Sequence, residues 1–230
     1  MNTRALKALV VYTGTWALLA SCSMGGDDYY PMKKGRVLSY RMARVATNAK
    51  KNEKTDSKLE RTFQEEKDLD GRKVVPVKQD GERGTSFIYV VKEQDGFYVH
   101  GVQGVGQEKP EIFATKRYFI RFPLEEGKGW EYESNIYIVK EKFPVTMKCT
   151  IRSLNDLITV PSGTYKKCLK TSCIGVTEKS IPLIGQIKFT KETTDWFAPG
   201  TGWVKGDLKE ECSLDEIGRV NASYELVATR

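Results

Sequence analysis

Side chains that could carry covalent or acid–base chemistry are few in this 230-residue sequence. There are five cysteines and a single histidine, His100. A Ser-His-Asp triad or a histidine-containing zinc site would therefore have to use His100. No Gly-x-Ser-x-Gly, His-Glu-x-x-His, P-loop or Gly-x-Gly-x-x-Gly motif occurs. We therefore expect no enzyme, no catalytic residue, no metal site and no cofactor, and a hydrolase built around His100 is the enzymatic alternative.

Cys22 is the cysteine whose neighbours indicate a covalent modification. Arg4 and Lys7 precede an apolar run of about 13 residues, which is shorter than the roughly 20 that span a bilayer as a helix. This pattern is typical of a secretory signal. Leu19-Ala20-Ser21-Cys22 resembles the lipobox of bacterial lipoproteins. We predict that residues 1–21 are a lipoprotein signal peptide, that Cys22 is acylated (palmitate included), and that residues 22–28 form a lipidated tether.

The residue after Cys22 and the overall charge bear on location and partners. Ser23 stands where aspartate would resemble the inner-membrane retention signal of enterobacteria, so the outer membrane, facing the periplasm, is favoured over the inner membrane. Removing residues 1–21 leaves 35 basic and 30 acidic groups, a net charge of +5. This charge fits a mixed solvated surface or attraction to anionic headgroups near the anchor. We expect no nucleic-acid partner, because no basic-aromatic module occurs.

The other four cysteines, an even number, could pair in an oxidising compartment. In the segment 145–151 the apolar residues alternate and place Cys149 on the core face. Cys173 shares a face with Leu169, whereas Cys168 lies on the opposite face with Lys170. This parity favours the disulfides Cys149–Cys173 and Cys168–Cys212 over a Cys149–Cys168 bond.

The elements that must position these residues are predicted to be strands. Asp-Gly dipeptides at 70–71, 80–81 and 95–96 separate apolar segments, which is a hairpin signal. The candidate strands cover 37–46, 73–77, 87–91, 97–100, 111–119, 135–140, 157–160, 186–190 and 224–227. The segment 49–66 is the best helical candidate, but its charge favours a solvated loop or a long exposed hairpin arm. We predict a mainly β fold, a curled antiparallel sheet or open barrel with little helix, over residues 29–230.

The sequence also contains an internal repeat. The segment from Tyr30 to Tyr40 aligns with the segment from Phe122 to Tyr132 at an offset of 92 positions, and Gly71 meets Gly163 at the same offset. A shared offset indicates two related halves, about 29–118 and 119–230. Two such halves could pair edge to edge, which would remove exposed strand edges.

Three motifs in the second half resemble those of uncharacterised bacterial periplasmic lipoproteins. They are Phe122-Pro-Leu-x-x-Gly-x-x-Trp-x-Tyr132, Val160-Pro-Ser-Gly-Thr-Tyr-x-x-Cys168 and Trp196-Phe-Ala-Pro-Gly-Thr-Gly-Trp-Val-Lys205. The resemblance covers roughly residues 120–228. This sequence departs from the family's motifs at three places. Ser162 stands where the family usually has alanine, Thr201 where it has valine, and Trp196-Phe197 where it has an aromatic pair that contains tyrosine. The resemblance implies a curled antiparallel sheet somewhat like the proteins that carry lipoproteins to the outer membrane, and it supplies no catalytic residues.

The third motif also offers a candidate binding surface. Pro199-Gly200 suits a type II turn, and the flanking Trp196, Phe197 and Trp203 are either core residues or an aromatic ligand platform. The leading functional hypothesis is a non-enzymatic envelope lipoprotein, anchored to the membrane through acylated Cys22, whose curled sheet binds an apolar ligand, a lipid or a lipoprotein partner. The alternatives are a structural or assembly factor that docks envelope proteins through an edge strand or the 47–66 arm, and the cryptic hydrolase.

Overall fold

The structure is a computed structural model that describes residues 26–139, 143–181 and 185–230. The predicted signal peptide and the lipidation site Cys22 lie outside the described residues. One short 3-10 helix, η1 (Gly26–Tyr29), precedes thirteen strands. The strands are β1 (Val37–Thr47), β2 (Asn52–Phe63), β3 (Lys67–Leu69), β4 (Arg72–Gly81), β5 (Gly84–Glu93), β6 (Gly96–Gln103), β7 (Glu111–Arg121), β8 (Gly129–Ile136), β9 (Phe143–Val160), β10 (Gly163–Ile181), β11 (Gly185–Ala198), β12 (Gly202–Cys212) and β13 (Arg219–Thr229).

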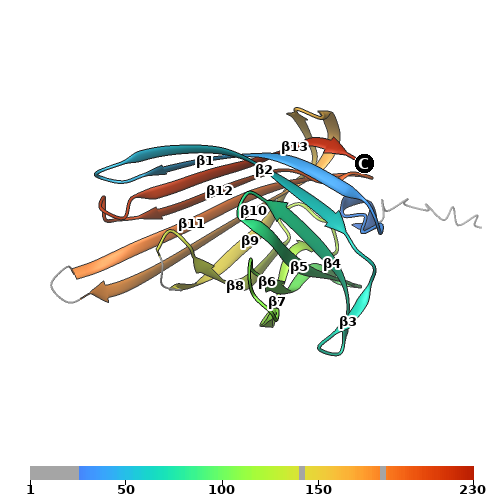
Figure 1. Cartoon of the computed structure of the whole chain (residues 1–230), viewed down its shortest axis with the longest axis horizontal. Coiled ribbons are helices and arrows are strands. Elements are labelled where there is room, and N and C mark those ends of the chain that lie inside the picture. Colours follow the sequence, from blue (N-terminus) through green and yellow to red (C-terminus); the bar gives the residue numbers. More distant parts are fainter. Residues whose placement is uncertain (1–25, 140–142, 182–184) are drawn as a thin grey trace, which may run out of the picture.

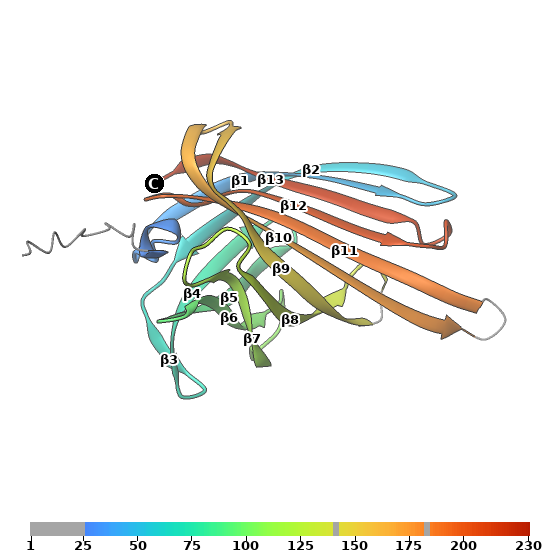
Figure 2. The same ribbon diagram turned by 180° about the vertical axis from the view of Figure 1, so that it is seen from behind.

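Twelve of the strands form one antiparallel, nearly closed, barrel-like sheet. Their order is β7-β6-β5-β4-β2-β1-β13-β12-β11-β10-β9-β8, and β3 pairs only with β4. The path begins at β7 and ends at β8, so these two consecutive strands face each other across an unsealed seam. The hairpins β1–β2, β10–β11 and β12–β13 extend beyond β4, β5 and β6 (Figures 1 and 2). The predicted curled antiparallel sheet is therefore confirmed.

Local sequence explains several of these elements. In β9, inward positions from Val145 to Ile151 are buried and the intervening ones are mostly exposed, which is the period-2 pattern of a half-buried strand. The turn Asp70-Gly71 has positive φ at both residues, 52° and 72°, as a two-residue hairpin turn requires. The segment 49–66, considered as a helix, contributes β2 and completes a long hairpin with β1, as the preferred interpretation predicted.

One predicted strand is misplaced. The range 135–140 was expected to be a strand, whereas β8 ends at Ile136 and the structure describes no residue from 140 to 142. The strand lies earlier because Trp130, Ser134 and Ile136 face inward and pair with the buried face of β9. The apolar residues at 137–139 follow β8 and are not part of it.

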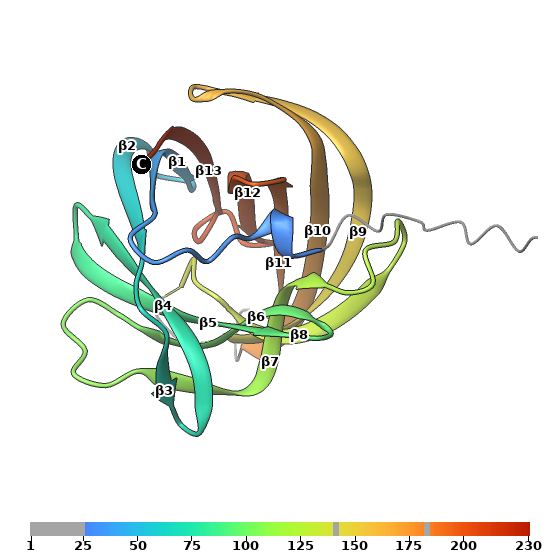
Figure 3. The same cartoon turned by 90° about the vertical axis from the view of Figure 1, so that its right-hand side faces the viewer.

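One end of the sheet is closed by the segment that follows η1. The ring of Tyr30 contacts the rings of Phe63, Phe97, Phe119 and Phe197 at centroid distances of 4.7–6.3 Å. The four partners come from β2, β6, β7 and β11, so one side chain ties distant parts of the sheet together. Figure 3 shows this N-terminal segment crossing the end of the sheet that faces the viewer.

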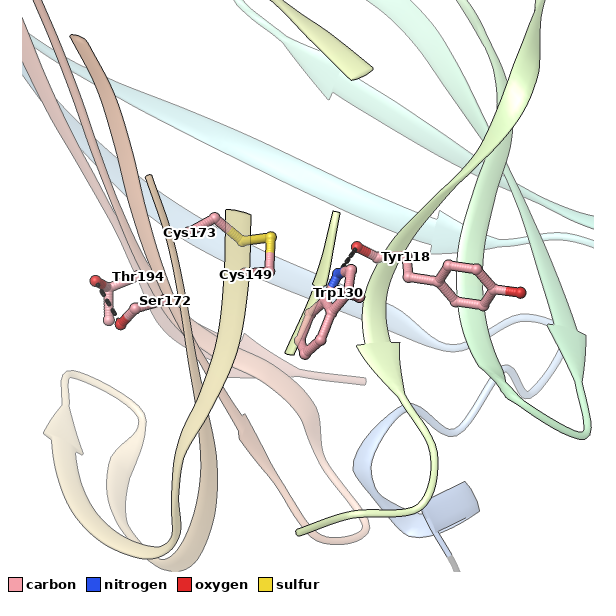
Figure 4. Close-up of a disulfide and its surroundings, with 6 residues drawn as sticks. All are labelled: Tyr118, Trp130, Cys149, Ser172, Cys173 and Thr194. Carbon is pink, nitrogen blue, oxygen red and sulfur yellow. Dashed lines mark hydrogen bonds between the residues drawn. A yellow bond between two sulfur atoms is a disulfide. The ribbon is translucent and has the colours of Figure 1, made fainter. Parts of the chain in front are cut away.

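The disulfide prediction is half right. Cys149 and Cys173 are directly opposite in β9 and β10 and form a disulfide beside Trp130 (Figure 4). Cys168 and Cys212 are both free and buried, so the predicted second pair is wrong. Leu169, next to Cys168, pairs with Phe197, whereas Cys212 pairs with Phe189. Eight residues of β11 separate those positions, about 27 Å at 3.4 Å per residue, far beyond the reach of a disulfide.

The two repeat segments adopt the same turn. Gly35 and Gly127 have φ of 80° and 85°. The Gly35 N–H donates to the Phe63 carbonyl at 2.8 Å, and the Gly127 N–H donates to the Ile151 carbonyl at 2.9 Å. In each case the strand that follows pairs with the strand carrying that carbonyl. The relation between the two complete halves stays a prediction.

Candidate functional site

A cavity of about 670 Å³ lies along the inner face of the sheet. Its volume is within the range of about 300–1,000 Å³ that ligand pockets occupy. Alternate residues of β1, β2, β12 and β13 form most of the wall, and β4, β5 and the segment after β8 complete it. The apolar residues of the wall include Met42, Leu59, Leu208, Val220 and Ala222. The charged ones include Arg44, Arg61 and Glu210, so the lining is mixed and not continuously apolar.

Arg61 is the most firmly held cation of the wall. Its guanidinium lies 4.2 Å from the ring centroid of Trp203 and 5.6 Å from that of Tyr40. With the Gln79 amide oriented by this contact, its oxygen accepts hydrogen bonds from Arg61 Nε and Nη2 at 2.9 and 3.0 Å. The contacts with the two aromatic rings and the hydrogen bonds to Gln79 fix the orientation of the planar guanidinium group. The alternation of side chains along a strand could have indicated the position of Arg61, because Arg61 shares the inner face of β2 with Leu59 and Phe63.

Asp195 lies behind the same aromatic group. Its carboxylate accepts a hydrogen bond from Trp203 Nε1 at 2.8 Å. Burial raises the pKa of Asp195 to about 6, although the Trp203 hydrogen bond and the charge of Arg61 act in the opposite direction. The Trp203 indole thus joins an inward-facing arginine to a buried carboxyl group.

A second buried polar group lies further along the inner wall. Lys191 Nζ is 3.0 Å from Glu210 Oε1, and both side chains are almost fully buried. Lys191 also donates to the Asn135 carbonyl at 2.8 Å, and Glu210 Oε2 accepts from the Tyr137 N–H at 2.8 Å. Burial lowers the pKa of Lys191, against the opposing effect of Glu210. These bonds tie β11 and β12 to the end of β8 and to Tyr137, which follows it, a connection that sequence spacing alone does not reveal.

The proposed aromatic platform is wrong. Trp196, Phe197 and Trp203 are 8%, 3% and 7% exposed, so no face of the group is open to a ligand. The indole of Trp196 donates to Asp156 at 3.0 Å, which satisfies its polar atom on the protein itself. The three rings belong to the core because the turn at Gly200 folds β11 and β12 tightly against each other.

His100 does not reach an evident catalytic partner. Its side chain is buried in β6, and its Nε2 atom forms no hydrogen bond within the described part of the chain. The adjacent hollow of about 440 Å³ is lined by residues such as Asp70, Arg72 and Thr115. In residues 26–139, 143–181 and 185–230 no hydroxyl or thiol forms a hydrogen bond with Nε2, so a nucleophile–base pair through that atom is not formed.

A side-chain-to-backbone hydrogen bond spans the unsealed seam between β7 and β8. No backbone ladder joins the two strands in the described residues, although they are the two ends of the sheet path. The indole of Trp130 in β8 donates to the backbone carbonyl of Tyr118 in β7 at 2.9 Å (Figure 4). This bond links β7 and β8 across the seam.

Residues 26–139, 143–181 and 185–230 contain no helix that is long and apolar enough to span a membrane. They also contain no group of three or more His, Cys, Asp or Glu side chains that could hold a metal ion.

Comparison with known proteins gives two structural neighbours. A candidate exported protein with a YmcC-like fold from Bacteroides fragilis aligns over 87% of this chain and 98% of its own, with 10% identity and a TM-score of 0.48. A candidate lipoprotein from Parabacteroides distasonis aligns over 88% and 98%, with 15% identity and a TM-score of 0.46. No protein family and no curated relative matches the sequence. At these TM-scores the neighbours carry no argument about function.

Proposed function

We propose that this protein is a non-enzymatic lipoprotein of the bacterial envelope that binds an acyl chain inside its curled sheet. The observation that carries the proposal is the 670 Å³ cavity on the inner face. Concave, partly apolar surfaces of this size are where proteins usually bind small ligands. The apolar residues Met42, Leu59, Leu208 and Ala222 offer such a ligand a surface.

The shape of the sheet supports a pocket in preference to a channel. Tyr30 closes one end by packing among four phenylalanine rings. The cavity begins near Arg61 and continues to Glu53, about 27 Å along β2 at 3.4 Å per residue, towards the opposite end. Along its rim lie Val105 and Tyr137, which are 51% and 62% exposed. Exposed apolar side chains beside a cavity suit the entry of an apolar ligand.

The anchor and the location belong to the same proposal. Acylation of Cys22 would attach the chain to the outer membrane, facing the periplasm, and four residues from Cys22 to Gly26 reach about 14 Å at most. Because Gly26 lies in η1 beside the closed end, the cavity would open away from the membrane that holds the anchor. A ligand would then enter from the periplasmic side.

The test is photo-crosslinking of the full-length chain in its membrane with a fatty acid that carries a diazirine on its chain. We expect labelled peptides from β1, β2, β12 and β13. Met42→Trp fills the cavity and should abolish labelling, whereas Ala43→Trp, the next residue on the outer face of β1, should leave it unchanged. Leu59→Trp is the second cavity-filling variant, and formation of the Cys149–Cys173 disulfide reports folding of each variant.

Labelling of folded Met42→Trp and Leu59→Trp at the wild-type level would overturn the proposal, because the ligand would then lie elsewhere. Capture of an envelope protein in place of the fatty acid would support the alternative of a docking or assembly factor.

A further inference from the structure

Two arginines face the cavity from neighbouring strands. Arg61 on β2 and Arg44 on β1 both line it, and both side chains are half-buried. Within the described ranges, no carboxylate forms an ion pair with either guanidinium. A partly desolvated cation without an anion is costly, and a bound anion recovers part of that cost.

The guanidinium of Arg61 is oriented and still has donors to offer. The Gln79 oxygen accepts one hydrogen bond from Nε and one from Nη2, and the guanidinium plane also contacts the rings of Trp203 and Tyr40. A guanidinium has five N–H donors, so three remain after the two bonds to Gln79. A fixed planar fork with free donors is the geometry that binds carboxylate and phosphate groups.

Two of the three acidic residues that line the cavity form ion pairs with lysines. Glu210 pairs with Lys191 and accepts the Tyr137 N–H. Glu53 forms an ion pair with Lys51 at 2.6 Å, at the far end of the cavity. Glu82 lies in the β4–β5 turn beside Arg83, so that turn brings both signs of charge to the rim. Glu53 also interacts electrostatically with Arg44 without forming an ion pair, so the positive charge of Arg44 and Arg61 is balanced only in part on the inner wall.

Asp195 is the remaining acid near Arg61. It accepts the indole N–H of Trp203 at 2.8 Å, and it forms no ion pair with Arg61 within the described residues. Its burial disfavours the charged form. Asp195 therefore compensates Arg61 only in part.

We propose that the ligand is an anionic amphiphile whose carboxylate or phosphate head group binds Arg61 and Arg44. Its acyl chain would lie against Met42, Leu208 and Ala222. The proposal deepens the function proposed above and rests on it, because it assigns the head group of the ligand that the cavity would hold.

The experiment displaces the diazirine fatty acid from the full-length chain with three competitors that share a palmitoyl chain. These are palmitate, palmitoyl lysophosphatidate and 1-monopalmitoylglycerol, which carry a carboxylate, a phosphate and a neutral head group. The two anions should displace the label at concentrations at least about tenfold lower than the neutral glyceride does, because the neutral head group cannot form an ion pair with the guanidinium groups. The stronger of the two anions identifies the head group.

Variants separate the two arginines from general charge. Arg61→Gln should weaken labelling about tenfold, and Arg61→Lys, which keeps the charge but not the fork, should weaken it less. Arg41→Gln is the matched control, because Arg41 lies on the outer face of β1 in an ion pair with Glu225. Arg44→Gln replaces Arg61→Gln as the test if the latter does not fold.

Equal displacement by all three competitors, with wild-type labelling of folded Arg61→Gln, would overturn the anionic head group and leave the acyl-binding function standing. Absence of any label from the cavity of the wild-type chain would instead overturn the proposed function itself.

Discussion

At the scale of single residues, the inner wall contains one carboxyl group whose pKa ties stability to pH. Burial raises the pKa of Asp195 to about 6 from an ordinary value of 3.8. The folded state therefore holds a proton that the unfolded state has released between these pH values. The free energy of unfolding should fall as the pH rises from about 4 to about 6.

Asp195→Asn should remove that pH dependence. The amide oxygen still accepts the Trp203 N–H, and no charge has to be buried. At pH 7 we expect the variant to be more stable than the wild type by about 2 kcal/mol, somewhat less than a shift of two pKa units implies. Urea unfolding at pH 4 and pH 7 measures this, and equal stability of both proteins at both pH values would contradict it.

The buried pair Lys191–Glu210 gives a second prediction at this scale. Lys191→Met leaves the Glu210 carboxylate buried without its cation, which should cost about 3–5 kcal/mol of unfolding free energy. Adding Glu210→Gln removes the charge while keeping an acceptor for the Tyr137 N–H. The double variant should therefore recover most of the loss in a thermal or urea unfolding cycle. Additive losses from the two substitutions would show that the pair does not interact.

At the scale of elements, the seam between β7 and β8 depends on Trp130. Trp130→Phe keeps a ring at the site but loses the N–H that binds the Tyr118 carbonyl. We expect a loss of about 1–3 kcal/mol and faster amide hydrogen exchange in β7 and β8 than in β1 and β2. Exchange accelerated equally in all strands, or in none, would show that this bond does not hold the seam.

Sequence patterns predicted individual elements better than their connections. Alternation placed Cys149 on the core face and so gave the right disulfide with Cys173. The same reasoning failed for Cys168, because parity says which face a residue takes and not how far along the sheet its partner lies. A bulge around Lys167, with φ of 55°, also breaks the alternation there.

The candidate site illustrates the same limit. Trp196 and Trp203 stand out in the sequence, yet both are core residues. Arg44 and Arg61 look like ordinary charges in a polar hairpin, and only the curl of the sheet brings them to one cavity. Burial of a strand's inner face depends on strands far away in the sequence, which no local pattern specifies.

At the scale of the whole molecule, closure of one end depends on Tyr30. Tyr30→Ala removes a ring that contacts four phenylalanines from four strands. We expect a loss of about 3–5 kcal/mol in urea unfolding, as for other large buried aromatics. A loss below about 1 kcal/mol would show that η1 and its flank merely rest on a sheet that closes without them.

The central claim is that a membrane-anchored chain holds an acidic, acyl-bearing ligand in its inner cavity. The most direct test is mass spectrometry of the full-length protein extracted from its own membrane, comparing the native with the denatured mass. We predict a denatured mass that begins at an acylated Cys22, and a larger native mass whose excess is extracted by organic solvent and ionises as an acidic lipid. An acylated protein with no excess native mass would contradict the account of the cavity, and an unmodified Cys22 would contradict the anchor.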